Sequence, residues 1–255
     1  MVRYLCGLLL LSSSIMLGTP EIYHIRDVVN YIDPSKRTLV LFDIDNTLLA
    51  PATDFGSDHW YDHLIRQKIA KGMDKTTAFN QLFPLILHLH LHVDLVPIES
   101  TLAEDIACIQ QLCDSTLFLT ARSPVLIERT LYHLQRHSLK FHGLELQEHT
   151  FNFEKPCVYK HGVLSCGWNN KGKVLIIFLE LINYMPDVII FIDDKQHHLD
   201  AVKTALEGTG IEFIGIRYAG SDHKAHRLNP EHIENELQAF LMTHPYTDEQ
   251  YAPFF

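Results

Sequence analysis

Hydrophobic residues along the chain alternate between short uncharged runs and longer segments with a helical period. The short runs are rich in Val, Ile, Leu and Phe, and they predict strands that are buried on both faces. The predicted strands are 37–42, 115–119, 187–192 and 211–218, and the predicted helices are 102–112, 124–137, 173–184, 196–207 and 231–241. Strands that alternate with helices in this way predict an α/β, Rossmann-like fold, in which helices cover both faces of a doubly wound parallel sheet.

The segment from about residue 50 to 96 interrupts this alternation. It contains aromatic and histidine-rich helical patterns, and it lies between the first two predicted strands. We expect it to form an inserted helical cap over the carboxyl edge of the sheet, where ligands bind in folds of this class. Loops and lids at such an edge choose substrates, so we expect substrate choice to be made here.

A second excursion, residues 157–166, predicts a β-hairpin. Gly162 can adopt a positive φ, so His161-Gly162 is typical of a two-residue turn. Counting outward from that turn, Cys157 faces Cys166 as a non-hydrogen-bonded pair with Cα atoms about 4.5 Å apart. A disulfide spans that distance. We therefore predict a cross-strand disulfide, and the alternative is two packed free thiols.

The N-terminus has the pattern of a secretory signal peptide, residues 1–18. Arg3 supplies a positive charge, and an uncharged apolar stretch follows up to Leu17. That stretch is shorter than the about 20 residues that a membrane span needs. We expect an exported protein, periplasmic or secreted, whose mature chain 19–255 has no stable membrane insertion. An uncleaved anchor and a buried first helix are the alternatives.

The formal net charge of −10 changes which partners we expect. Phosphate backbones and anionic lipid surfaces would repel such a chain, so nucleic acid is not an expected partner. A small phosphorylated substrate remains compatible, because a local cation or metal ion can override the global charge.

The strongest candidate for chemistry is the segment that follows the first predicted strand. Asp43 and Asp45 stand two apart where the chain turns, so one carboxylate could attack phosphorus while the other protonates the leaving oxygen. Two neighbouring carboxylates repel unless a cation lies between them. Mg²⁺ fits, because it binds through carboxylates and substrate phosphate. A strand-end turn with solvated acids is the alternative.

Three other predicted strand or helix ends carry polar residues. Thr120 ends a strand beside a helix N-terminus, which is an anion site. Lys171 precedes a predicted helix, where a cation is mildly unfavourable unless it has a function. Asp193 and Asp194 end five apolar residues, and two adjacent acids there are costly unless they bind a cation or donors. We expect Asp193 to bind metal directly and Asp194 to support the site or to bind through water. Which of the two binds directly stays open.

This order of motifs resembles that of the haloacid dehalogenase-like superfamily over residues 37–220. The phrases Leu119-Thr120-Ala121-Arg122 and Asn170-Lys171-Gly172 most resemble an uncharacterised branch of exported bacterial proteins in that superfamily. The resemblance implies that Asp43 is the nucleophile and Asp45 the general acid and base. It also implies sites for phosphate and for Mg²⁺. The phosphate-binding residues would be Asn46, Thr120, Ala121 and Lys171; the metal ligands would be Asp43, the Asp45 carbonyl and Asp193; the supporting residues would be Asp194, Thr47 and Arg122.

Several histidines are weaker candidates. As a strand, His88, His90 and His92 would share one face, whereas a helix puts only His88 and His92 together. A zinc or copper site and a polar cap face are both open. His197-His198 follows the acid pair and could reach the mouth of the site.

The favoured function is a Mg²⁺-dependent phosphatase that hydrolyses a small phosphomonoester through an aspartyl-phosphate. Asp rather than Ser at position 45 fits phosphatases better than dehalogenases. A non-catalytic binding protein of the same fold and a phosphotransferase are the alternatives.

Overall fold

The structure is a computed structural model that describes residues 18–144, 146–222 and 230–247. The predicted signal peptide therefore lies almost entirely outside the described residues. Within the described part, the chain forms an eight-stranded sheet in the order β1-β10-β9-β2-β5-β8-β7-β6. Its strands are β1 Glu21–Ile22, β2 Thr38–Phe42, β5 Ser115–Thr120, β6 His149–Asn152, β7 Pro156–Lys160, β8 Val163–Ser165, β9 Val188–Asp193 and β10 Glu212–Tyr218.

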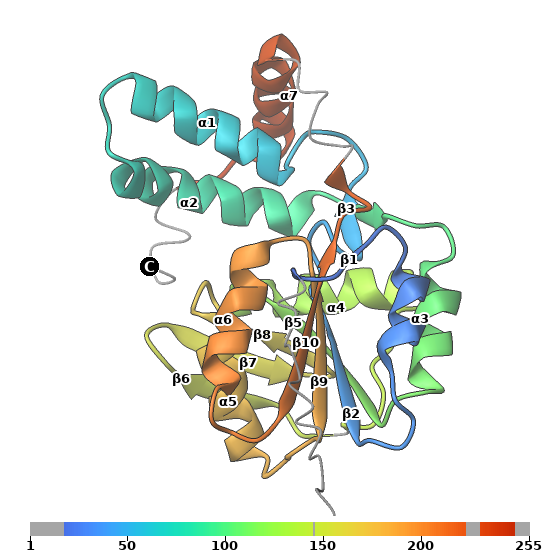
Figure 1. The fold of residues 1–255 in the computed structure, drawn as a ribbon. Coiled ribbons are helices and arrows are strands. Elements are labelled where there is room, and N and C mark those ends of the chain that lie inside the picture. The colour runs from blue at the N-terminus through green and yellow to red at the C-terminus, as the bar shows by residue number, and fades with distance from the viewer. Residues whose placement is uncertain (1–17, 145, 223–229, 248–255) are drawn as a thin grey trace, which may run out of the picture.

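In this spatial order, neighbouring strands pair parallel from β1 as far as β8. The last two pairs, β8 with β7 and β7 with β6, are antiparallel. Its two faces are covered by η1 Ile25–Tyr31, α3 Leu102–Gln110, η2 Pro124–Leu126 with α4 Ile127–Arg136, α5 Lys171–Leu181 and α6 Gln196–Leu206. Figure 1 shows α5 and α6 on one side and η1 with α3 on the other. The predicted Rossmann-like α/β fold is confirmed.

Strand β2 shows why this sequence makes a sheet with two buried faces. Val40 and Phe42 join the apolar cluster under η1, α3 and α4, while Leu39 and Leu41 join the cluster under α5 and α6. All four side chains are fully buried. Burying a side chain of this size contributes about 1.5–3 kcal/mol, so a charge at any of these positions would be costly. The strand ends where the first acid, Asp43, follows.

A separate helical unit lies above the carboxyl edge of the sheet (Figure 1). The chain leaves through β3 Leu49–Pro51 and returns through β4 Leu95–Pro97, which pair antiparallel. Between them run α1 Asp58–Ala70 and α2 Lys75–His92, whose N-termini are capped by Ser57 and Asp74. The last helix, α7 Pro230–Thr243, packs against them through Ile233 rather than against the sheet. We call α1, α2 and α7 the three-helix unit.

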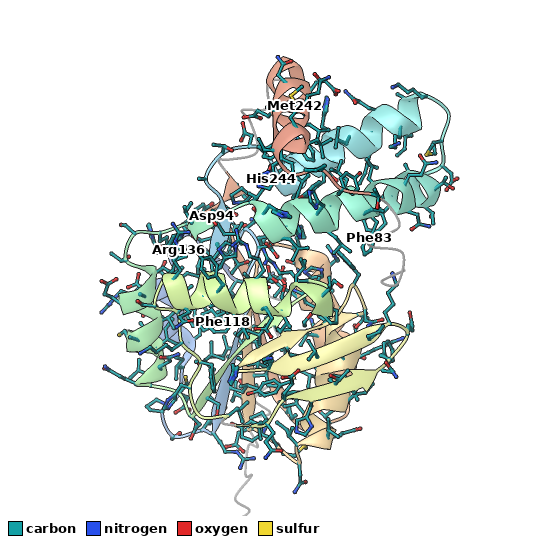
Figure 2. The ribbon with its side chains drawn as sticks, turned by 180° about the vertical axis from the view of Figure 1, so that it is seen from behind. Phe83, Asp94, Phe118, Arg136, Met242 and His244 are labelled. Atoms are coloured by element: carbon teal, nitrogen blue, oxygen red, sulfur yellow. The ribbon has the colours of Figure 1, made fainter. Side chains whose placement is uncertain are left out.

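The three-helix unit is fastened to the sheet domain at the end of α2. Arg129 donates to the backbone oxygen of His92 at 3.1 Å and to the Asp94 carboxylate at 2.8 Å. Arg136 reaches the other oxygen of Asp94 at 2.9 Å, and Figure 2 shows these two side chains meeting beside α4. The end of α2 is therefore fixed to α4, beside the candidate site.

The 157–166 hairpin forms with the predicted register. Val158 pairs with Ser165 and Lys160 with Val163, and His161 and Gly162 both have positive φ. The excursion is not separate from the fold, however, because β8 pairs with β5 and extends the main sheet.

The predicted disulfide between Cys157 and Cys166 is wrong, because both cysteines are free and buried. Strand β8 ends at Ser165, and the backbone N–H of Cys166 turns away to donate to Thr120. The Cys157 thiol donates to the carbonyl oxygen of Cys166 at 3.5 Å and accepts from the Asn169 amide at 3.2 Å. The structure instead has the alternative that the sequence left open, two packed free thiols.

Candidate active site

The carboxyl ends of β2 and β9 bring the first pair of acids together. Phe42 is in register with Ile192, and the backbone N–H of Asp43 donates to the Ile192 oxygen at 2.9 Å. The next residue on each strand is then an aspartate, Asp43 on one and Asp193 on the other. Strand β5 lies on the other side of β2, with Phe118 opposite Phe42, so Thr120 ends at the same edge.

The amine of Lys171 lies between these two carboxylates. It donates to Asp43 Oδ1 at 2.5 Å and to Asp193 Oδ2 at 2.7 Å, and its side chain is fully buried. The sequence predicted Lys171 just before a helix, but it is the first residue of α5, after the Asn170 cap. Next to it, Gly172 lets α5 approach α6, since a Cβ there would lie 2.1 Å from the Ala201 oxygen. The close helix contact places the amine.

Burial and neighbouring charges set the protonation of this group. Burial raises the pKa of Asp43 to about 6 against the opposing pull of Lys171. Burial also acts on Asp193, but the ammonium of Lys171 and a hydrogen bond from His198 outweigh it and lower the pKa of Asp193 to about 2. Burial raises the pKa of Asp194 to about 8. For Asp43 and Asp194, burial and the neighbouring carboxylates together outweigh the nearby lysines.

Asp45 points away from this group and is bound by Arg122. The Nε and Nη2 groups of Arg122 donate to the two carboxylate oxygens at 2.8 Å each, and its Nη1 donates to the Thr130 hydroxyl at 3.1 Å. Burial favours the neutral acid, but the guanidinium outweighs it and holds the pKa of Asp45 well below its usual range. The structure therefore keeps Asp45 ionised.

The turn after β2 is fixed by short-range contacts. Thr47 Oγ1 donates to Asp43 Oδ2 at 3.4 Å and accepts the backbone N–H of Asp194 at 3.1 Å. Asn46 has a φ of 61°, a left-handed conformation that Asn tolerates better than most residues. Its side-chain amide donates to Asp58 of α1 at 3.1 Å. Asp58 also pairs with Lys195, so one carboxylate of the three-helix unit joins two loops of the sheet domain.

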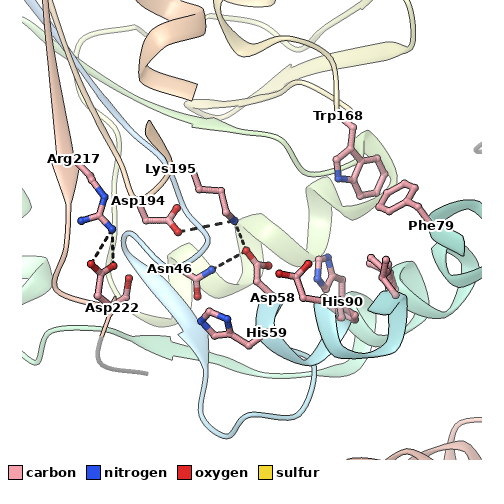
Figure 3. A pocket seen from close by; sticks show the side chains of 15 residues that line it. Asn46, Asp58, His59, Phe79, His90, Trp168, Asp194, Lys195, Arg217 and Asp222 are labelled. Carbon is pink, nitrogen blue, oxygen red and sulfur yellow. Dashed lines mark hydrogen bonds and ion pairs between the residues drawn. The ribbon is translucent and has the colours of Figure 1, made fainter. Parts of the chain in front are cut away.

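A cleft of about 570 Å³ opens between the sheet edge and the three-helix unit. Figure 3 shows Asp194, Lys195 and Asn46 along one side, with His90, Phe79 and Trp168 along another. This volume is in the range of small-molecule sites.

The carboxylates fit a divalent cation. Asp43, Asp193 and Asp194 each offer an oxygen, and these atoms lie within 4.8 Å of one another. Such hard oxygen donors suit Mg²⁺. Around them, five carboxylates meet only three cations; the carboxylates are Asp43, Asp45, Asp58, Asp193 and Asp194, and the cations are Arg122, Lys171 and Lys195. With all five carboxylates ionised, the excess negative charge would equal that of one divalent ion. Asp194 belongs to this group together with Asp193, whereas the sequence left open which of the two binds metal directly.

The remaining phosphate-site candidates form one loop after β5. Thr120 is buried, and its hydroxyl accepts the backbone N–H of Arg122 at 3.2 Å. The Ala121 oxygen accepts the backbone N–H of Trp168 at 2.8 Å. This loop and Lys171 lie at the same edge of the sheet, so the structure brings the predicted residues together.

The three histidines of α2 lie on two different faces, as helical spacing predicts. The rings of His88 and His92 lie 4.4 Å apart on one face of α2, toward α7, while His90 lines the cleft. Among the described residues, the histidines of α2 belong to no cluster of three or more metal-ligand side chains. His198 reaches the Asp193 carboxylate at 3.0 Å, and His197 packs on its ring.

Sequence reasoning missed the residues that the three-helix unit and the loops bring to the cleft. Tyr61 and Trp168 were not singled out, although Trp168 precedes Asn170-Lys171-Gly172 by two residues, and Lys195 directly follows Asp194. His90 was considered only as part of a histidine cluster. Asp58 follows the helix cap Ser57 and could have been noticed as an acid in a first helical turn.

Comparisons with known proteins give a family without an assigned activity. A family model described as "Protein of unknown function (DUF2608)" matches residues 21–251. A Chlamydia pneumoniae protein named "Putative outer membrane protein" is 26% identical over 82% of this chain and 78% of its own length. A Chlamydia trachomatis protein of the same name is 24% identical over 91% of this chain and 92% of its own length. A solved haloacid dehalogenase-like hydrolase from Streptococcus pneumoniae is 13% identical, covering 80% of this chain and 98% of its own, with a TM-score of 0.41.

Proposed function

The chain belongs to the DUF2608 family, and we propose that it is a Mg²⁺-dependent phosphatase acting on a small phosphomonoester. The observation that supports this most directly is the Lys171 amine between Asp43 and Asp193, with an Asp194 oxygen in the same group. A nucleophile, a buried cation and a candidate divalent site at one strand edge are the parts that phosphoryl transfer needs.

In the first step, an oxygen of Asp43 attacks phosphorus. A bond forms between them as the bond from phosphorus to the leaving oxygen breaks, and that oxygen takes a proton from Asp45. In the second step, water gives a proton to the Asp45 carboxylate and attacks phosphorus. The bond between phosphorus and the Asp43 oxygen breaks, inorganic phosphate leaves, and Asp43 is restored as a carboxylate. The Lys171 amine and the Thr120 loop hold the phosphoryl oxygens throughout.

The ion pair with Arg122 sets the protonation state of Asp45, and this state suits one of the two steps better than the other. An ionised Asp45 is ready to act as the base for water, whereas protonating the leaving group needs Asp45 as an acid. The phosphate of an entering substrate competes for the same guanidinium, and that competition weakens the hold of Arg122 on Asp45.

Mg²⁺ would be held by Asp43, Asp193 and Asp194, and when bound it would neutralise charge on the transferring phosphoryl group. The residues fit the ion, as their oxygen spacing and excess negative charge indicate.

The test is phosphate release from a panel of phosphomonoesters with Mg²⁺ or EDTA. We expect turnover by the wild type with Mg²⁺, and loss of at least 10³-fold in Asp43→Asn, since a covalent nucleophile cannot be replaced by an amide. Asp200→Asn is the matched control, because Asp200 is an exposed aspartate of α6. Full activity of Asp43→Asn would reject the mechanism.

Two other functions give different results in the same assay. A phosphotransferase would yield a phosphorylated alcohol when glycerol is added. A non-catalytic binding protein would show no turnover, and the ion pair that occupies Asp45 is the observation in its favour.

The names of the relatives support export of this chain from the cytoplasm. No helix within the described ranges is long and apolar enough to cross a membrane. Fractionation of cells that produce the full-length chain tests export, which a cytoplasmic location would contradict.

A further inference from the structure

Trp168 has an unusual backbone next to the candidate phosphate loop. Its φ is 59° and that of the preceding Gly167 is 58°. A bulky residue with a left-handed backbone is uncommon, because this conformation is strained for any side chain with a Cβ. Gly or Asn would take this conformation more readily, so the backbone does not explain why a tryptophan stands here. We therefore look for a role of the side chain.

Backbone hydrogen bonds fix Trp168 to the loop after β5. Its N–H donates to the Ala121 oxygen at 2.8 Å, and the N–H of Gly167 donates to the Arg122 oxygen at 3.0 Å. One residue earlier, Cys166 donates to Thr120 at 2.8 Å. The position of the indole is thus tied to the loop that we expect to bind phosphate.

One side of the indole is packed and another contributes to the cleft. Phe83 of α2 meets it edge-on with ring centroids 4.5 Å apart, and Phe79 lies 6.4 Å away. Trp168 and Phe79 both line the cleft and are only partly buried, and Figure 3 shows them side by side at one end of it. Together they make an aromatic wall.

Two residues that line the same cleft each have a buried polar atom without a partner among the described residues. Tyr61 Oη and His90 Nδ1 are buried and have no hydrogen bond within the described part of the chain. Their rings are 5.4 Å apart, and both residues line the cleft. An unsatisfied buried polar group is unfavourable, and a ligand with its own donor or acceptor would satisfy it.

We propose that the cleft takes phosphomonoesters whose leaving group carries an aromatic ring. The ring stacks on the aromatic wall of Trp168 and Phe79, and a polar group of the same molecule bonds to Tyr61 and His90. This inference rests on the proposed phosphatase function. Nucleoside monophosphates and aryl phosphates share the required chemistry, and the substrates below distinguish them.

Substrate selectivity tests the wall. We compare kcat/KM for AMP, O-phosphotyrosine and glycerol 2-phosphate in the wild type, Trp168→Leu and Trp168→Phe. We expect wild-type preference for one or both aromatic substrates. Stacking contributes about 1–3 kcal/mol per ring, so the preference should fall about 5-fold to 150-fold in Trp168→Leu and be largely restored in Trp168→Phe. AMP preference alone identifies nucleotides, and phosphotyrosine preference alone identifies aryl phosphates.

An equal fall for all three substrates, or no wild-type preference, would overturn the inference while leaving the phosphatase intact. Absence of turnover with every substrate would instead remove the proposed function.

Fluorescence gives a readout that does not need turnover. The chain has two tryptophans, and Trp60 is fully buried. In Trp60→Phe/Asp43→Asn, Trp168 is therefore the emitting indole. We expect phenyl phosphate or AMP to quench its emission saturably, inorganic phosphate to compete, and glycerol 2-phosphate to leave the emission unchanged. Lack of quenching by both aromatic ligands contradicts the inference.

Discussion

Arg122 and Asp45 form a two-point ion pair that joins the loop after β5 to the loop after β2. Both bonds are 2.8 Å long, and the Arg122 side chain is 3% exposed against 28% for Asp45. Removing one partner of a buried pair leaves an uncompensated charge, which costs about 3–5 kcal/mol. Substituting one partner therefore measures how much this pair contributes to holding the two loops together.

We expect Arg122→Gln to lower the free energy of unfolding by about 3 kcal/mol in urea denaturation. Adding Asp45→Asn to it should recover part of the loss, because the orphaned charge is removed. Arg136→Gln is the control: Arg136 pairs with Asp94 on the surface, where such pairs are worth less than about 1 kcal/mol. Equal losses for Arg122→Gln and Arg136→Gln would contradict the structural role of the buried pair.

Gly172 fixes the position of Lys171 through the contact of α5 with α6. An added Cβ would lie 2.1 Å from the Ala201 oxygen and 2.9 Å from the Ala205 Cβ. Alanine favours helices by about 1 kcal/mol over glycine, but a backbone overlap can be relieved only by moving a helix. We expect Gly172→Ala to lower the free energy of unfolding by about 2 kcal/mol, as overpacking does, and to reduce phosphatase activity.

Gly208 offers the comparison for that experiment, because it lies beyond the end of α6 with nothing within 4 Å of an added Cβ. Its φ of 79° strains any side chain, so Gly208→Asn keeps a residue that tolerates this conformation. We expect Gly208→Asn to leave activity unchanged. Wild-type stability and activity in Gly172→Ala would show that the helices do not need this contact.

The strand ends were predictable because they depend on local pattern. Five uncharged residues before Asp43 and before Asp193 predict buried strands, and parallel strands bring their carboxyl ends to one edge. The positions of Trp168 and Asp58 were not predictable, since loop hydrogen bonds and helix packing set them. The disulfide failed for a similar reason: hairpin register was right, but strand β8 stopped one residue before Cys166.

Mg²⁺ should stabilise the fold, because the ion binds the folded carboxylate group. At ten times its Kd, a ligand specific for the native state adds about 1.4 kcal/mol, or about 3–5 °C in Tm for a chain of this size. We expect that shift in the wild type by scanning fluorimetry, and less than half of it in Asp194→Asn. Asp62→Asn is the control, since Asp62 lines the cleft but lies outside the carboxylate group. The same Mg²⁺ shift in Asp194→Asn as in the wild type would remove Asp194 from the site.

His133 of α4 makes stability depend on pH. Its side chain is fully buried, and neither ring nitrogen has a hydrogen-bond partner among the described residues. Burial is the main cause that lowers its pKa from 6.5 to about 4. Arg129, Arg122 and His137 act in the same direction and Asp94 opposes them. The folded chain thus holds this ring neutral where the unfolded chain would protonate it.

Between pH 6.5 and 4 the unfolded chain binds more protons at His133, so stability falls as the pH falls through this window and is fully present above it. The slope from one such group is at most about 1.4 kcal/mol per pH unit. We expect His133→Leu to flatten the wild-type dependence of urea-unfolding free energy between pH 6.5 and 5, because it removes the proton site and leaves no buried polar nitrogen. His142→Gln, at an exposed position, should keep the wild-type slope. If His133→Leu keeps that slope as well, the pH dependence arises from other groups.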